Sequence, residues 1–244
     1  MISLSVVIPA YNEADRLWPT LSGLAQFLPV FLGHQGFEVI LVSDGSRDET
    51  ERVMQRWIRH CRVCRHQPTQ WQLIKLPTNQ GKGAAVRAGM LASIGEYVLF
   101  MDADGATPIE MLTPLYKALQ DGADVAFASR ALPVGKMPVK ARRHRHILGR
   151  LFHGMIASKI AGIHDSQCGF KLFKREVIAG LFVPLKLSGY LFDVEILMRG
   201  QHNGLKMSEI AAPWHDVPGS KLSIVHDTPG ILRELLGLYW LRLE

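Results

Sequence analysis

The sequence predicts an α/β protein with a mostly parallel central sheet flanked by helices. Short runs rich in β-branched residues alternate along the chain with longer amphipathic stretches, which is typical of parallel strands joined by crossover helices. The 244 residues, 48% of them hydrophobic and 20% charged, are enough to bury one full core. We find no internal repeat, low-complexity tract or linker, and therefore expect a single domain over residues 1–244.

The expected elements are most regular in the first half of the chain. Five strands, each ended by turn residues, are expected at residues 4–9, 37–42, 71–76, 97–101 and 124–129. The helices expected there cover residues 13–31, 48–62 and 83–93, with Ser46 as N-cap of the second. In the second half we expect strands at 168–173 and 206–211 and helices at 193–203 and 231–243, after a mixed apolar and basic stretch at 147–163. Doubly wound sheets bind ligands at the carboxyl ends of their strands.

Acidic residues follow three of these strands. Glu13 comes after the first strand, Asp44 after the second, and Asp102 and Asp104 directly after the strand at 97–101. Two carboxylates separated by one small residue suit a hard divalent cation that also binds phosphate oxygens. A chance D-x-D pair, and a plain turn role for Asp44 in SDGS, are the competing interpretations.

The segment NQGKG at residues 79–83 lies between an expected strand and an expected helix. Its glycines would let backbone N–H groups and Lys82 approach an anionic ligand. It is not a Walker A loop, because Leu76 stands at the first glycine position and Gly83 replaces the Ser or Thr. Val86 occupies the last position of a G-x-G-x-x-G fingerprint, so a dehydrogenase is not expected.

The net charge of +6 is concentrated in one run without acids, made of Lys136, Lys140, Arg142, Arg143, Arg145 and Arg150. Such a run indicates anionic partners or is merely a solvated face. Apolar residues follow it, a pattern compatible with a helix on an anionic membrane surface. The helix at 231–243 fits either the core or the same surface.

Three irregularly spaced cysteines favour a reducing compartment. No apolar run reaches the roughly 20 residues that span a bilayer, and the first strand leaves no room for a signal peptide. We expect a cytoplasmic protein in peripheral contact with the cytoplasmic face of a membrane. The cluster His60, Cys61, Cys64 and His66 lacks the distant second pair of most structural zinc sites, and His144 and His146 are assigned to the basic surface.

Six segments together resemble family 2 glycosyltransferases with the GT-A fold. They are VIPAYNE (7–13), SDGS (43–46), NQGKG (79–83), DADGAT (102–107), DSQCGFKLF (165–173) and GSKL (219–222). The last two are most similar to dolichyl-phosphate β-glucosyltransferases and dolichol-phosphate mannose synthases. The resemblance implies a nucleotide-sugar-binding half at about 1–130 and an acceptor-binding half at about 131–244.

The resemblance also implies roles for individual residues. The nucleotide sugar would contact Pro9, Tyr11, Glu13, Asp44, Lys82 and Asp102. The metal ligands would be Asp102, Asp104 and Gln167, and the acceptor phosphate would meet Arg130, one or both of Arg142 and Arg143, and Lys221. Of these, Asp102, Asp104, Arg130 and Lys221 would carry the catalysis.

The implied reaction is inverting transfer of a hexose onto a polyprenyl phosphate, with Mg²⁺ or Mn²⁺ as cofactor. UDP-glucose is the expected donor, and GDP-mannose the alternative. A phosphate monoester has a second pKa near ~6, so its oxygen needs no general base at neutral pH. A sugar nucleotidyltransferase is a rival, but that class has a glycine-rich loop after the first strand, where this chain has PAYNE. Only charge favours a nucleic-acid-binding module, and no nucleic-acid partner is expected.

Overall fold

The computed structural model describes residues 2–63, 69–133, 159–213, 224–241 and 243. Within this part of the chain, seven strands form one sheet with the order β3-β2-β1-β4-β6-β5-β7. The strands are β1 (Ile2–Ala10), β2 (Gly36–Ser43), β3 (Thr69–Lys75), β4 (Tyr97–Met101), β5 (Val125–Ser129), β6 (Phe170–Lys174) and β7 (Met207–Ala211). The helices are α1 (Ala14–Leu32), α2 (Thr50–Val63), α3 (Lys82–Ala92), the 3-10 turn η1 (Ile109–Met111), α4 (Leu112–Gln120), α6 (Arg175–Phe182), α7 (Phe192–His202) and α8 (Ile224–Tyr239).

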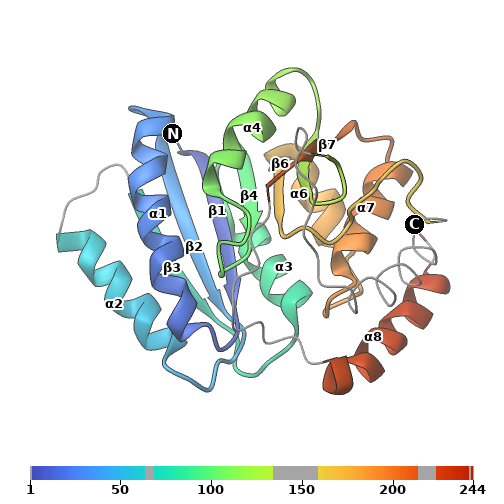
Figure 1. Cartoon of the computed structure of the whole chain (residues 1–244), viewed down its shortest axis with the longest axis horizontal. Helices are drawn as coiled ribbons and strands as arrows, with labels where there is room; N and C mark the ends of the chain where they lie inside the picture. The colour runs from blue at the N-terminus through green and yellow to red at the C-terminus, as the bar shows by residue number, and fades with distance from the viewer. Residues whose placement is uncertain (1, 64–68, 134–158, 214–223, 242, 244) are drawn as a thin grey trace.

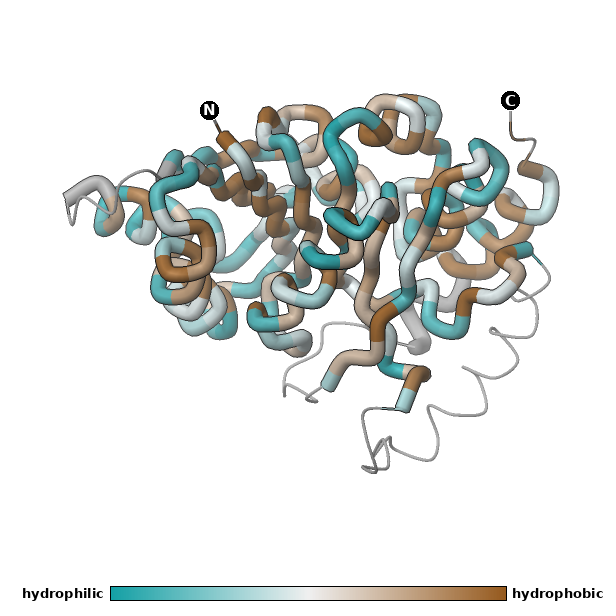
Figure 2. The backbone as a smooth tube through the Cα atoms, turned by 90° about the horizontal axis from the view of Figure 1, so that it is seen from above, coloured by the Kyte–Doolittle hydropathy of each residue, from teal (hydrophilic) through white to brown (hydrophobic). Residues whose placement is uncertain are grey.

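Helices cover both faces of this sheet (Figure 1). One core packs α1, α2 and α4 against alternate strand residues such as Val6 and Leu99. The other packs α3, α6, α7 and Leu238 of α8 against the intervening residues, including Val7 and Phe100. In Figure 2 apolar and polar residues alternate along the outer helices, as expected of helices with one face on the sheet and the other in water.

The sheet is parallel except at β6. Strands β1, β2, β3 and β4 pair in parallel, as do β5 and β7, whereas β6 is antiparallel to both β4 and β5. The register pairs Met101, the last residue of β4, with Phe170, the first residue of β6. The segment before β6 therefore reaches the edge at which the parallel strands end, and the two halves of the chain share one sheet.

The structure confirms the predicted α/β class and each strand to within two residues. The sequence did not predict α4 or α6, and α8 begins at Ile224 rather than at residue 231. The predicted cap was wrong: the Ser46 hydroxyl accepts a hydrogen bond from the Asn12 N–H, while Asp48 accepts the N–H of Thr50 at the start of α2. Most of the stretch at 147–163 lies outside the described residues. None of the described helices is long and apolar enough to cross a membrane.

Candidate active site

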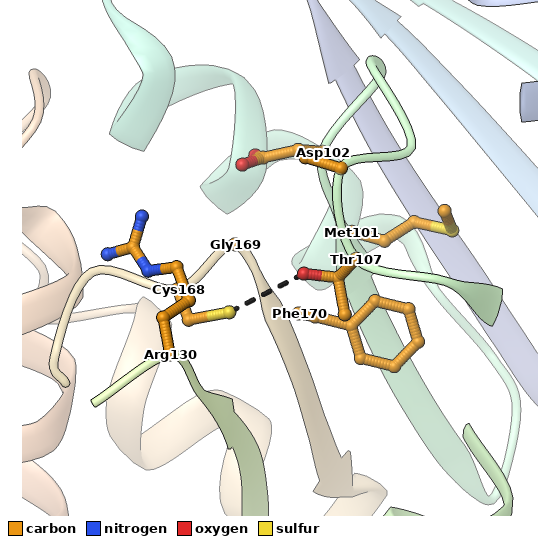
Figure 3. A pocket seen from close by; sticks show the side chains of 8 residues that line it. Met101, Asp102, Thr107, Arg130, Cys168, Gly169 and Phe170 are labelled. Carbon is orange, nitrogen blue, oxygen red and sulfur yellow. Dashed lines mark hydrogen bonds between the residues drawn. The ribbon is translucent and has the colours of Figure 1, made fainter. Parts of the chain in front are cut away.

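The candidate site lies at the edge of the sheet where β1, β2, β4 and β5 end and β6 begins. Asp102 follows β4, Arg130 follows β5, and Gln167 precedes β6. A small pocket at this edge is lined by Met101, Asp102, Ala106, Thr107, Arg130, Cys168, Gly169 and Phe170 (Figure 3). The antiparallel direction of β6 therefore brings a loop of the second half of the chain beside the carboxylates of the first half.

Asp102 is fixed from two sides. Its backbone N–H donates to the carbonyl oxygen of Gly169 at 2.9 Å, and its Oδ1 lies 2.7 Å from Nζ of Lys82. A Cβ at position 169 would lie 2.1 Å from Oδ2 of Asp102, so only glycine leaves room for this carboxylate. Burial acts to lower the pKa of Lys82, but the carboxylates of Asp102, Asp193 and Asp104 outweigh it and raise that pKa. Lys82 is therefore a cation at neutral pH.

Asp104 is connected to Glu13 through Arg16. Oδ2 of Asp104 lies 3.4 Å from Nη1 of Arg16, and the same guanidinium donates two hydrogen bonds to Glu13, at 2.7 and 2.5 Å. The other Asp104 oxygen accepts the N–H of Ala106. Arg16 was not among the residues predicted from the sequence, although its spacing of three residues from Glu13 at the start of a helix is a recognisable ion-pair signal.

Gln167 is held by its own loop and by the segment before α7. Its backbone N–H donates to Asp165, and its side-chain Nε2 donates to the carbonyl oxygen of Tyr190 at 3.3 Å. Two carboxylates and one amide oxygen are hard oxygen ligands that suit Mg²⁺ or Mn²⁺. Within the described residues there is no group of three or more His, Cys, Asp and Glu side chains that would hold a metal ion. The candidate protein ligands for a cation here are Asp102, Asp104 and the amide oxygen of Gln167.

Arg130 forms a bidentate ion pair with Asp165. Nε and Nη2 of Arg130 donate to the two carboxylate oxygens at 2.6 and 2.8 Å, and the Arg130 N–H donates as well. Burial acts to raise the pKa of Asp165, but the hydrogen bonds and charge of Arg130 have the larger effect and lower it. Burial acts to lower the pKa of Arg130, but Asp165 has the larger effect and raises it. Figure 3 shows the guanidinium and the Asp102 carboxylate on the same side of the pocket.

The segment at 79–83 does not form the expected backbone cradle for an anion, because three of its N–H groups have acceptors within the protein. The N–H groups of Gln80 and Gly81 both donate to the carboxylate of Asp44, at 2.7 and 2.9 Å. Those of Gly83 and Ala84 donate to carbonyl oxygens of residues 188 and 189. Three N–H groups of the 79–83 segment, and that of Ala84 after it, are thus used inside the protein, so Lys82 supplies the positive charge. Burial raises the pKa of Asp44 more than its two hydrogen bonds lower it.

Pro9 and Tyr11 lie at the same edge of the sheet. Pro9 is buried inside β1 opposite Val42, and Tyr11 is partly buried just beyond the strand. The remaining predicted site residues, Arg142, Arg143 and Lys221, lie outside the described residues. Cys64 and His66 of the possible zinc cluster, and His144 and His146, also lie outside the described residues.

A buried ion pair supports the loop before β6. Nζ of Lys171, which is fully buried, donates to Oδ1 of Asp193 and to the carbonyl oxygen of Cys168, both at 2.6 Å. Burial raises the pKa of Asp193 although Lys171 and Lys82 act in the opposite direction. This pair was not predicted from the sequence; its signal was a lysine within the apolar run FKLF. Burial also raises the pKa of the Cys168 thiol, which contacts the Thr107 hydroxyl and is not a thiolate nucleophile.

The sheet topology, with an Asp-x-Asp pair after β4, is that of the GT-A glycosyltransferases. The chain belongs to glycosyl transferase family 2, because the model of that family matches residues 5–182. The curated relatives include the dolichyl-phosphate beta-glucosyltransferase of Saccharomyces cerevisiae. It is 34% identical to this chain over 96% of this chain and 73% of its own length. The protein of that name from Homo sapiens is 36% identical over 90% of this chain and 69% of its own length.

Solved structures with the same fold include glucosyl-3-phosphoglycerate synthase from Mycobacterium tuberculosis in complex with UDP. It has a TM-score of 0.69 and 18% sequence identity, and the match covers 97% of this chain and 79% of that one. A second complex of that enzyme contains Mn²⁺, UDP and glucosyl-3-phosphoglycerate, with a TM-score of 0.67, 16% identity and coverage of 96% and 77%. These matches agree with the fold found here.

Proposed function

We propose that this glycosyltransferase moves glucose from UDP-glucose onto a polyprenyl phosphate with inversion at the sugar, giving a β-linked product. The observation that carries the proposal is that Asp102, Asp104 and Gln167 come from two distant segments to one edge of the sheet beside Lys82. Relatives that are 34–37% identical over about nine-tenths of the chain carry the name dolichyl-phosphate beta-glucosyltransferase, which favours glucose over mannose.

Asp102, Asp104 and the amide oxygen of Gln167 would hold a divalent cation, Mg²⁺ or Mn²⁺. When bound, this cation offsets the negative charge that develops on the departing nucleoside diphosphate. Lys82 adds a second positive charge at the same place, because its ammonium lies 2.7 Å from Asp102. Pro9, Tyr11, Glu13 and Asp44 line the adjacent edge, where we place the nucleoside.

The acceptor needs positive charge more than it needs a base. A phosphate monoester is largely deprotonated at neutral pH, since its second pKa is near ~6. Its oxygen attacks the anomeric carbon, the bond from that carbon to the donor diphosphate breaks, and the electron pair leaves with UDP. Arg130, which Asp165 holds in a fixed orientation, offsets repulsion between the two anions. Arg142 or Arg143, together with Lys221, completes this role in our proposal.

We place the outer face of α8 against the membrane that holds the lipid acceptor, on its cytoplasmic side. Leu232, Leu236 and Tyr239 of this helix, and Trp240 directly after its end, are 54–77% exposed and recur at helical spacing. Leu238 on the inner face is buried. Tyr and Trp side chains favour the interface between lipid and water. The arrangement fits peripheral contact, with the helix lying in the plane of the interface.

The test is transfer of radiolabel from UDP-glucose, GDP-mannose and other donors to polyprenyl phosphate, followed by lipid extraction. We expect labelled lipid from UDP-glucose with a divalent cation present, and a loss of about a hundredfold or more in Asp104→Asn. Asp15→Asn changes an exposed carboxylate two residues from Glu13; it is the control and should retain activity. An α-linked product, release of pyrophosphate instead of UDP, or full activity in EDTA would contradict the proposal.

A further inference from the structure

Helix α8 contacts the loop at residues 187–191 through one carboxylate. Oε1 of Glu234 accepts a hydrogen bond from the N–H of Gly189 at 2.5 Å, and Oε2 accepts one from the N–H of Leu191 at 3.0 Å. Both oxygens of a single side chain are therefore engaged by the backbone of this loop. Two hydrogen bonds to a charged acceptor hold a loop more firmly than neutral ones would.

The same loop contacts two parts of the candidate active site. The carbonyl oxygens of Ser188 and Gly189 accept hydrogen bonds from the N–H groups of Ala84 and Gly83, in the first turn of the helix that begins at Lys82. The carbonyl oxygen of Tyr190 accepts a hydrogen bond from the side-chain amide of Gln167. The loop thus lies between α8 on one side and Lys82 and Gln167 on the other.

The contacts on either side of this loop leave little free space. A Cβ at Gly81 would lie 2.4 Å from the carbonyl oxygen of Ser188, and a Cβ at Gly189 would lie 2.5 Å from Oε1 of Glu234. A displacement of the loop would therefore also displace its two neighbours, the segment around Gly81 and the Glu234 side chain.

We propose that Glu234 is a positioning residue for the nucleotide and the metal. It touches neither, but by fixing the 187–191 loop it keeps Lys82 and the amide of Gln167 in place. This inference rests on the metal-dependent nucleotide binding of the proposed function. It also connects the helix that we place at the membrane with the donor site.

Calorimetric titration of the purified chain with UDP in the presence of Mn²⁺ tests this inference without an acceptor. Glu234→Ala should weaken UDP binding about tenfold, because the loop loses both charged acceptors. Glu234→Gln, which keeps one carbonyl acceptor, should fall between that variant and the wild type. Arg233→Ala removes an exposed neighbour on the same helix and should bind UDP as the wild type does.

Amide hydrogen exchange provides a readout that does not depend on nucleotide. Exchange at the N–H groups of Gly189 and Leu191 should speed up in Glu234→Ala, while exchange in the central sheet should stay unchanged. Unchanged UDP binding despite faster exchange in the loop would overturn the inference while leaving the proposed function intact. Absence of metal-dependent UDP binding by the wild type would overturn both.

A second variant changes the same contact from the other partner. In Gly189→Ala the new methyl group would meet the end of the Glu234 side chain, which must move away from the loop. We expect the same loss of UDP binding as in Glu234→Ala, and no further loss when the two changes are combined. Additive losses in the double variant would show that the two residues act separately, against the inference.

Discussion

The ion pair between Arg130 and Asp165 makes part of the protein's stability dependent on pH. Asp165 has a lowered pKa in the folded protein, because hydrogen bonds and charge from Arg130 outweigh the effect of burial. A carboxylate of this kind stabilises the fold fully above its unfolded-state pKa of about 4. That contribution is lost as the pH falls through the lower folded-state pKa.

We therefore expect Asp165→Asn to lower the free energy of unfolding at pH 7 by about 1–3 kcal/mol, since the Arg130 side chain is 35% exposed and partly screened by water. The difference from the wild type should shrink below about pH 4. Urea unfolding at several pH values measures this difference. A constant difference down to acid pH would show that Asp165 acts without its charge.

Gly169 determines whether Asp102 fits its place. A methyl group at this position would lie 2.1 Å from the Asp102 carboxylate, which must then rotate away from Lys82. Gly169→Ala should lower transferase activity by about a hundredfold or more, the magnitude expected for losing a group that binds the developing charge. Its melting temperature should change little. Gly180→Ala, whose new methyl group meets only open space and one side chain at 3.8 Å, is the matched control.

Residue patterns predicted some of these roles and missed others. Asp102, Asp104 and Gln167 stand in segments that resemble a family, so their convergence was expected. Asp165 and Glu234 were not assigned, because each acts through a partner 35 or more residues away that only the fold brings near. Arg16 was also missed, although its contact with Glu13 spans three residues and only its contact with Asp104 depends on the fold. The proposed backbone cradle at 79–83 was wrong for a related reason: sequence does not show which N–H groups already have an acceptor.

At the scale of elements, the periodicity of apolar residues located every strand but not its direction. The run at 168–173 was expected as a strand, and nothing in its composition indicates that it enters the sheet antiparallel. Helices α4 and α6 were missed because they are short, and short helices depend on packing more than on their own pattern. Helix α8 was predicted, but its sequence did not decide whether the helix packs in the core or lies on a membrane surface.

The outer face of α8 should control attachment to lipid. Replacing Leu236 and Trp240 by serine removes two of its exposed apolar side chains and should weaken binding to anionic vesicles about tenfold or more, since burial of each such side chain contributes roughly 1.5–3 kcal/mol. Vesicle sedimentation measures the change. UDP binding should not change, because both side chains are exposed, at 64% and 77%, and the loop contact is made by Glu234. Equal vesicle binding by both proteins would exclude this face as the membrane contact.

At the scale of the whole molecule, nucleotide and metal should stabilise the fold together. Ligands that bind only the folded state raise stability by about 2.7 kcal/mol at a hundredfold excess over Kd, or about 5–10 °C in melting temperature for a chain of this size. We expect UDP with Mn²⁺ to produce such a shift in the wild type, and EDTA to remove it. Asp104→Asn should show almost none. A shift that persists in EDTA would show nucleotide binding without the cation.

The place of β5 affects how the chain folds as it leaves the ribosome. Among the described strands, β5 pairs with β6 and β7 alone, which are made some 40 and 80 residues later, whereas β1 to β4 pair with one another. A nascent chain that ends near residue 130 thus carries the mostly apolar strand VAFAS with both edges unpaired. The fragment at about 1–130 would not be a free-standing unit, so the predicted donor and acceptor halves would have to fold together.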